Sequence, residues 1–263
     1  MSKLAKKLIA ENKRTKAKFL DLGKCGLKEI PAEIAEMIWL EGLSLAPRTR
    51  NHKRSAWQVY ESPNDGAENT FDNLGPLEPM SGLRNLWLGK TKVVDLAPLA
   101  KLSSLQTLDL ERTGATNLAP LDRLNELREL NLEGTPVADL APLSRLRSLR
   151  VLILDDTQVT DLAPLARLSG LEALYCSRTP VVDLTPLSRL LSLRVLFLEY
   201  TQVTDLAPLA RLSGLEELSY NRTPVVDLTP LSRLRSLREL FLGNTQVSDL
   251  TPLAGLLDLR NLF

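Results

Sequence analysis

A 22-residue frame recurs through most of this chain without insertion or deletion. The copy from Leu193 to Gly214, LRVLFLEYTQVTDLAPLARLSG, represents it, and the common pattern is L-x-x-L-x-L-x-x-T-x-V-x-D-L-x-P-L-x-R-L-x-x. Other copies begin at Leu83, Leu105, Leu127, Leu149, Leu171, Leu215 and Leu237, and a further one starts at Leu259. Self-similarity at a fixed period of this length is typical of solenoids, whose units bury their apolar faces against neighbouring units. The period therefore predicts one elongated array over most of the chain.

The two halves of the frame predict the two sides of a coil. In L-x-x-L-x-L the leucines alternate with variable residues, as in a strand with one buried face, and successive strands would stack in parallel about 4.8 Å apart. In the second half the leucines recur three apart, which suits a short helical or 3-10 turn. A strand that packs against a bulkier return segment curves the stack. The sequence thus predicts an α/β solenoid with a parallel sheet on its concave face and short turns on its convex face.

Polar residues recur at fixed places in the frame. The aspartate at the thirteenth position is expected to cap the return turn, and the proline three residues later lies in the first turn, where its missing N–H costs little. The threonine at the ninth position predicts a hydroxyl ladder that satisfies backbone groups between coils. One carboxylate per coil, accompanied by a Lys or Arg column, is interpreted as structural rather than as a calcium site.

Four segments are expected along the chain. Residues 1–18 carry apolar side chains at helical spacing among lysines and predict an N-terminal helical cap. Residues 19–45 are degenerate first repeats, and residues 73–263 are regular repeats. Between them, at residues 46–72, the period fails. This stretch is interpreted as an eroded repeat or as an insertion, which would be either a binding element or an inert surface loop.

The repeated pattern resembles the leucine-rich repeat family, in the 22-residue subclass shared by bacterial internalins and phosphatase-1 regulatory subunits. The D-L-x-P-L element is closer to the bacterial members, and threonine in place of the usual asparagine is similar to cytosolic bacterial members. The resemblance is continuous over residues 73 to 263, with weaker units at 19 to 45. The opening LDLGKCGLKEIPAEI also resembles the start of the arrays in bacterial Roco-type GTPases.

Composition favours a cytoplasmic protein. The formal net charge of +1 provides no global attraction to nucleic acid or membranes. Two cysteines, Cys25 and Cys176, argue against a disulfide framework and are interpreted as core residues of a protein in a reducing compartment. No apolar run approaches the roughly 18 residues of a spanning helix. The run Leu8-Ile-Ala10 is too short for a secretory signal core.

The variable residues at the third, fifth and seventh positions of each unit would project from the concave sheet. On three central strands they place six apolar or aromatic side chains side by side, which predicts a contact surface, because solvent-facing positions have no packing reason to be so apolar. Aromatic residues recur in one column and acidic residues flank the patch, as in protein-binding surfaces. The predicted protein-binding residues are Trp87, Glu129, Val151, Ile153, Asp155, Ala173, Tyr175, Val195, Phe197, Glu199, Tyr200, Glu217, Glu239 and Phe241, with Asp109, Glu111 and Glu133 in the rim and Phe263 in the aromatic column.

An internal duplication supports this surface. Residues 157–198 and 201–242 are nearly identical copies with six differences. Four of the six fall at outward strand positions: Ala173/Glu217, Tyr175/Ser219, Ser177/Asn221 and Val195/Glu239. Exposed convex positions such as Ser188/Ser232 did not change, so simple drift of exposed positions does not account for the pattern.

Catalytic chemistry is not indicated. His52 is the only histidine, so a Ser-His-Asp or Cys-His arrangement would depend on that residue. The chain has no glycine-rich phosphate loop and no C-x-x-C or H-E-x-x-H spacing, and neither a metal nor a cofactor is expected. Nucleic acid needs a basic face with aromatics, whereas this aromatic face is edged by acids.

The function expected from the residues is a non-enzymatic recognition module, bacterial and cytoplasmic, without membrane or nucleic-acid contact. It would bind a protein or peptide on the concave sheet, and the acidic rim would select a basic partner. Three alternatives stay open. The array ends mid-strand at Phe263 without a polar cap, which favours self-association through that end or the sensing part of a larger protein such as a Roco-type GTPase. The subclass resemblance alone implies a phosphatase regulatory subunit.

Overall fold

The computed structural model describes residues 2–53 and 56–263, with the side chains of all of these except residues 50–58. The chain forms two compact units, Met1–Pro136 and Val137–Phe263. No helix in the described part of the chain has both the length and the apolar character needed to cross a membrane.

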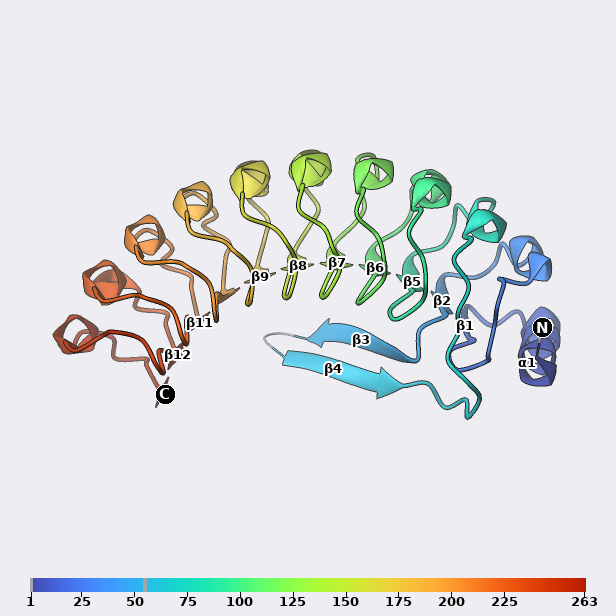
Figure 1. The fold of residues 1–263 in the computed structure, drawn as a ribbon, viewed down its shortest axis with the longest axis horizontal. Coiled ribbons are helices and arrows are strands. Elements are labelled where there is room, and N and C mark those ends of the chain that lie inside the picture. Colours follow the sequence, from blue (N-terminus) through green and yellow to red (C-terminus); the bar gives the residue numbers. More distant parts are fainter. Residues whose placement is uncertain (1, 54–55) are drawn as a thin grey trace. The chain divides into compact units, whose positions relative to one another are not determined.

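The first unit consists of a helix, parallel strands joined by 3-10 turns, and one hairpin (Figure 1). Five of its described strands run parallel in the order β1-β2-β5-β6-β7. Its elements are α1 (Lys3–Thr15), β1 (Phe19–Asp21), η1 (Ala32–Glu36), β2 (Gly42–Ser44), β3 (Arg48–Lys53), β4 (Ala56–Glu61), η2 (Gly75–Leu77), β5 (Asn85–Trp87), η3 (Ala97–Lys101), β6 (Thr107–Asp109), η4 (Ala119–Leu121) and β7 (Glu129–Asn131).

The second unit contains only repeats. Its strands are parallel from β8 to β13, and paired residues lie 22 positions apart, as in Val195 opposite Glu217. The elements are η5 (Ala141–Arg145), β8 (Val151–Ile153), η6 (Ala163–Arg167), β9 (Ala173–Tyr175), η7 (Thr185–Leu187), β10 (Val195–Phe197), η8 (Ala207–Leu209), β11 (Glu217–Ser219), η9 (Thr229–Arg233), β12 (Glu239–Phe241), η10 (Thr251–Leu253) and β13 (Asn261–Leu262). In each unit the strands lie on one side of the coils and the 3-10 turns on the other (Figure 1). The predicted α/β solenoid of parallel strands and short turns is confirmed.

The frame leucines form the core of both units. Within one coil, Leu193, Leu196 and Leu198 have no exposed surface, and Leu206 and Leu209 of the return segment are equally buried. Burying one leucine side chain contributes roughly 2 kcal/mol. The same set recurs in coil after coil, so apolar burial stabilises the stack rather than any single coil.

The aspartate and threonine columns form hydrogen bonds to the backbone of their own coil. Each aspartate accepts a hydrogen bond from the N–H two residues later, as in Ala97 N to Asp95 Oδ1 at 2.8 Å, directly ahead of the 3-10 turn. The threonine hydroxyl donates to the carbonyl three residues earlier, as in Thr157 Oγ1 to Leu154 O at 2.6 Å. The prediction that these hydroxyls link neighbouring coils is therefore wrong. Neighbouring coils are already joined by hydrogen bonds between backbone N–H and carbonyl groups. The threonine hydroxyl instead donates to the carbonyl at the end of the strand in the same coil.

Helix α1 covers the outer edge of β1. It begins after the N-cap Ser2, whose hydroxyl accepts a hydrogen bond from Ala5 N, and ends at Thr15. Asn12 is buried and donates from Nδ2 to Phe19 O of β1 at 3.0 Å. Trp39 Nε1 donates to Asn12 Oδ1 at 2.9 Å. The helix therefore satisfies a backbone carbonyl that an edge strand would otherwise leave open.

The stretch where the period fails carries an inserted hairpin. β2 pairs directly with β5, so no strand of the parallel set lies between them. The intervening chain forms the antiparallel pair β3–β4 and then returns to the frame past Asn69. The Asn69 side chain is buried, donates to Leu22 O and Leu45 O at 2.9 and 2.8 Å, and accepts from Leu27 N at 2.8 Å. One amide thus fastens the insertion to two coils.

Asn69→Ala is expected to destabilise the first unit by about 2 to 4 kcal/mol, because it leaves buried backbone groups without partners. Urea unfolding followed by tryptophan fluorescence measures this, since all three tryptophans of the chain lie in the first unit. Asn125→Ala, a change at an exposed asparagine, is the control and should shift stability by less than about 0.5 kcal/mol. Equal effects of the two substitutions would contradict the role of Asn69.

Tyr220 occupies a frame position that the other regular coils fill with leucine, except for Cys176 in one of them. Its side chain is fully buried, and its hydroxyl has no hydrogen-bond partner among the described residues. Burial also raises the pKa of Tyr220. Tyr220→Phe is expected to raise the free energy of unfolding by about 1 kcal/mol, because it removes an unsatisfied buried hydroxyl. Thermal unfolding by circular dichroism, with the exposed Tyr200→Phe as control, checks this; a lower melting temperature for Tyr220→Phe would argue against it.

Candidate functional site

The outward residues of the parallel strands form three columns, because strands in register place equivalent residues side by side. We call this surface the strand face of each unit. In the second unit, the third-position column is Val151, Ala173, Val195, Glu217, Glu239 and Asn261. The fifth-position column is Ile153, Tyr175, Phe197, Ser219, Phe241 and Phe263. The seventh-position column is Asp155, Ser177, Glu199, Asn221 and Gly243.

The apolar centre of this face is packed and does not face solvent. The exposed fractions are 4% for Val151, 2% for Ile153, 1% for Ala173, 5% for Tyr175 and 4% for Val195. The prediction that these five side chains are solvent-facing is therefore wrong. Within the unit, Ala173 lies between Val151 and Val195, and the Tyr175 ring meets the Phe197 ring edge-on with centroids 5.1 Å apart. These side chains behave as core residues.

The aromatic column becomes accessible toward β13. Phe197 and Phe241 are half-buried, and Phe263 is 62% exposed. Ser219, the small residue between the first two, lets the Phe197 and Phe241 ring centroids approach to 6.5 Å. Phe241 and Phe263 stack nearly parallel with centroids 4.8 Å apart. The column therefore presents a row of three rings, all of which belong to the aromatic column expected from the sequence.

Tyr200 follows β10 at the eighth position of its coil and is 42% exposed. The guanidinium carbons of Arg178 and Arg222 each lie 5.1 Å from its ring centroid, which places a cation near the ring from either neighbouring coil. Its backbone is left-handed, with φ 58°. The non-glycine residues that share this conformation at this coil position are Lys90, Arg112, Asp156, Arg178, Tyr200, Arg222 and Asn244.

Two of the predicted acidic residues hold the loops that follow the strands. Asp155 Oδ1 accepts from Ser177 N at 2.6 Å. Glu199 Oε1 accepts from Ser219 Oγ at 2.6 Å and from Asn221 Nδ2 at 3.3 Å. Their carboxylates therefore link neighbouring coils.

Glu217 and Glu239 are half-buried on β11 and β12. Glu239 Oε1 accepts from Asn261 Nδ2 at 3.2 Å. The pair places two carboxylates of the third-position column beside the aromatic row, because their strands are paired in register. The accessible part of the second strand face thus combines aromatic rings with negative charge.

The strand face of the first unit is largely occupied by the chain itself. Figure 1 shows β3 and β4 on the strand side, away from the 3-10 turns. Arg48 donates from Nη2 to Glu111 Oε1 at 2.6 Å, and Glu111 is only 1% exposed. The hydrogen bond to Glu111 is the main cause that raises the pKa of Arg48, and the charges on Glu133 and Glu61 act in the same direction. The acidic rim expected to select a basic partner therefore binds a basic side chain of the insertion.

The remaining predicted residues of this unit are less accessible than expected. Trp87 is 6% exposed and packs edge-on against Phe19, with ring centroids 6.0 Å apart. Asp109 is 3% exposed and accepts from Glu111 N and from Asn131 Nδ2 at 2.8 and 3.0 Å. Glu129 is half-buried. Sequence reasoning missed the pairing of the hairpin with this face, although basic residues in the insertion and acids in the strand columns were both visible.

The thiols are not positioned for reaction. Cys25 and Cys176 are free and buried. Burial raises the pKa of Cys25 to about 11 and also raises the pKa of Cys176, so both stay protonated near neutral pH. This agrees with their interpretation as core residues. The side chain of His52 lies outside the described residues.

Glu111→Ala is expected to loosen the hairpin, because the Arg48 guanidinium, only 24% exposed, loses its counter-charge. Hydrogen–deuterium exchange of the amides in β3 and β4 should accelerate about tenfold or more. Glu78→Ala removes the exposed partner of Lys101 and should leave that exchange unchanged. Unaltered exchange in Glu111→Ala would show that this ion pair does not hold the hairpin.

Comparison with known proteins finds leucine-rich repeat proteins of similar fold. No protein-family model and no curated protein matches it. Internalin C2 from Listeria monocytogenes is 36% identical, with a TM-score of 0.69 over 70% of this chain and 81% of the internalin. The internalin InlF from the same species is 21% identical, with a TM-score of 0.64 over 89% of this chain and 76% of InlF. A leucine-rich repeat protein from Leptospira interrogans is 22% identical, with a TM-score of 0.76 over 88% of this chain and 56% of that protein.

Proposed function

Because this chain belongs to the leucine-rich repeat proteins, we propose that it is a non-enzymatic recognition module that binds a protein or peptide on the strand face of its second unit. The contact is made by the row Phe197, Phe241 and Phe263 together with Tyr200. Glu217 and Glu239 lie beside this row and favour a partner that presents basic residues next to an apolar side chain.

One observation carries this proposal: aromatic rings that are exposed or half-buried gather on β10 to β13. Tyr200 is 42% exposed, and Phe197 and Phe241 are half-buried with their rings on the strand face. Large apolar side chains grouped on a surface mark interaction sites, and Tyr and other aromatic residues dominate the binding energy of such sites. The buried residues Val151, Ile153, Ala173, Tyr175 and Val195 lie beside this row on the same strand face and are too little exposed to be part of the proposed contact.

Three further features support the subclass, origin and location proposed for this protein. The offset of 22 residues between paired strand residues supports the 22-residue subclass. The similarity to internalin C2 supports a bacterial origin. The two buried, free thiols suit the reducing cytoplasm.

Site-specific photo-crosslinking tests the location of the contact. A benzophenone side chain at Phe241 is expected to capture a partner from lysate of the source cell. The same probe at Val226, an equally apolar position that is 53% exposed but outside the strand face, is the matched control and should capture nothing.

The captured product should disappear when Tyr200→Ala is added, since truncation of an aromatic contact residue weakens binding about tenfold or more. The double change Glu217→Lys with Glu239→Lys should weaken capture as well, because it reverses the charge beside the rings. Equal capture from Val226 and Phe241, or capture that survives Tyr200→Ala, would place the site elsewhere.

A further inference from the structure

The turn side of the second unit carries a column of arginines. The nineteenth position of each frame is Arg145, Arg167, Arg189, Arg211 and Arg233, and all five side chains are exposed. Among the described residues none of the five forms an ion pair. The acids of the neighbouring column are already engaged: Glu172 lies 3.6 Å from Arg150, and Glu216 binds Arg194 and Arg238 at 2.8 and 3.2 Å. Among the described residues, the five guanidinium groups therefore have no carboxylate within ion-pair distance.

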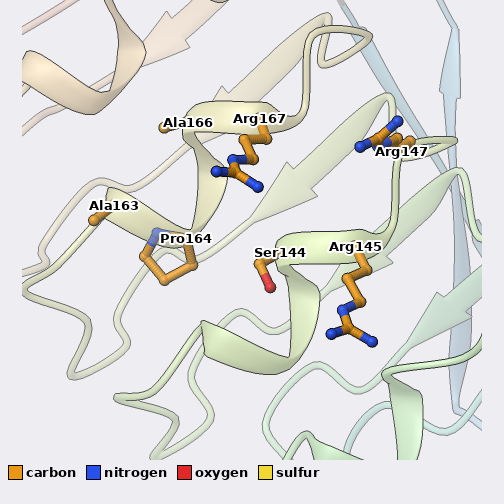
Figure 2. A pocket seen from close by; sticks show the side chains of 7 residues that line it. All are labelled: Ser144, Arg145, Arg147, Ala163, Pro164, Ala166 and Arg167. Carbon is orange, nitrogen blue, oxygen red and sulfur yellow. The ribbon is translucent and has the colours of Figure 1, made fainter.

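Between η5 and η6 the arginines border a groove of about 630 Å³. Figure 2 shows that its lining side chains come from two successive coils, with Arg145 and Arg147 on one and Arg167 and Pro164 on the next. The Arg167 side chain extends from its own turn toward Ser144 of the preceding coil (Figure 2). Arg147 and Arg167 therefore approach the groove from two successive coils, whereas the Arg145 guanidinium extends away from η6 (Figure 2).

Arg147 distinguishes this groove from the others of the unit. The equivalent positions in the next three coils are Ser169, Leu191 and Ser213. Arg235 restores an arginine, but the coil after it has Gly255 where this groove has Arg167. Within the described residues of the second unit, no other pair of successive coils brings three arginines to these positions.

We propose that the groove between η5 and η6 binds a small ligand that carries more than one phosphate group. Guanidinium groups bind phosphate through paired, charge-assisted hydrogen bonds, and the two that approach from Arg147 and Arg167 suit a ligand with more than one phosphate. The volume lies in the range of small-molecule sites and exceeds what one phosphate fills. The lining of arginine, serine, alanine and proline has no aromatic side chain on which a nucleic-acid base could stack.

The test uses the full chain and tripolyphosphate as the probe, in isothermal titration calorimetry at physiological ionic strength. We expect saturable binding that Arg147→Ser weakens about tenfold or more, because each guanidinium makes charge-assisted hydrogen bonds to the anion. Serine is the residue that two of the following coils carry at this position, so the variant keeps a side chain that the frame accepts. Arg167→Ser, on the other coil, should weaken binding to a similar degree.

Arg211→Ser is the matched control. It removes the same charge as Arg167→Ser from the same frame position, next to grooves with two arginines, and should leave the affinity within a factor of about two. Equal loss in Arg211→Ser and Arg167→Ser would overturn the proposal, since binding would then reflect general surface charge. Absence of saturable binding, or saturable binding of a polyglutamate peptide without binding of tripolyphosphate, would also overturn it.

Vesicles containing phosphatidylinositol bisphosphate identify the source of the phosphates. Co-sedimentation with them that depends on Arg147 would assign a lipid headgroup, whereas tripolyphosphate binding without co-sedimentation would assign a free ligand. Both outcomes keep the groove as the site. The result is independent of the strand face, because in this unit the 3-10 turns lie on the opposite side of the coils from the strands (Figure 1).

Discussion

Backbone hydrogen bonds between successive coils determine where every other group in this protein lies. In the second unit, Glu216 N donates to Arg194 O at 2.8 Å on one side of a strand, and Leu198 N donates to Ser219 O at 2.7 Å on the other. Each such bond joins residues about one frame apart, so the leucines of successive coils within a unit meet in the core of that unit. The constraint also explains how a departure from the period is accommodated. The extra residues after β2 leave the coil as a hairpin, and the register resumes at β5.

The outward strand positions have different roles in the two units. In the first unit, buried carboxylates such as Glu111 bind Arg48 of the hairpin, so charge recognition is intramolecular. In the second unit, the rings of Phe241 and Phe263 are supported from one side by their coils and remain open on the other. Burying a charged group requires a specific partner, whereas an aromatic surface tolerates solvent at lower cost. The accessible rings are therefore the better candidates for contact with another molecule.

The sequence was sufficient for the fold because a repeated pattern specifies both the elements and their neighbours. The leucine spacing gave strands and 3-10 turns at the expected positions, and the aspartates do bind the first N–H of each turn. The threonine ladder was misassigned because the pattern does not show which backbone carbonyls are already bonded. The site was harder to predict. Outward positions were assumed to be exposed, yet Ala173 and Tyr175 are buried, and periodicity alone carries no information on what packs over a strand.

The residue at the eighth position of each regular coil has a left-handed backbone conformation, and this position can vary in sequence between arrays. This backbone conformation disfavours a side chain by roughly 1 to 2 kcal/mol, and glycine adopts it without strain. Only Gly134 uses that option among the described regular repeats, whereas other coils hold residues such as Asp156, Arg178 and Tyr200 there. Nothing in the packing of the leucines selects among these side chains. The position can therefore change its chemistry from coil to coil at constant backbone geometry, and arrays with the same leucine frame can differ there in what they recognise.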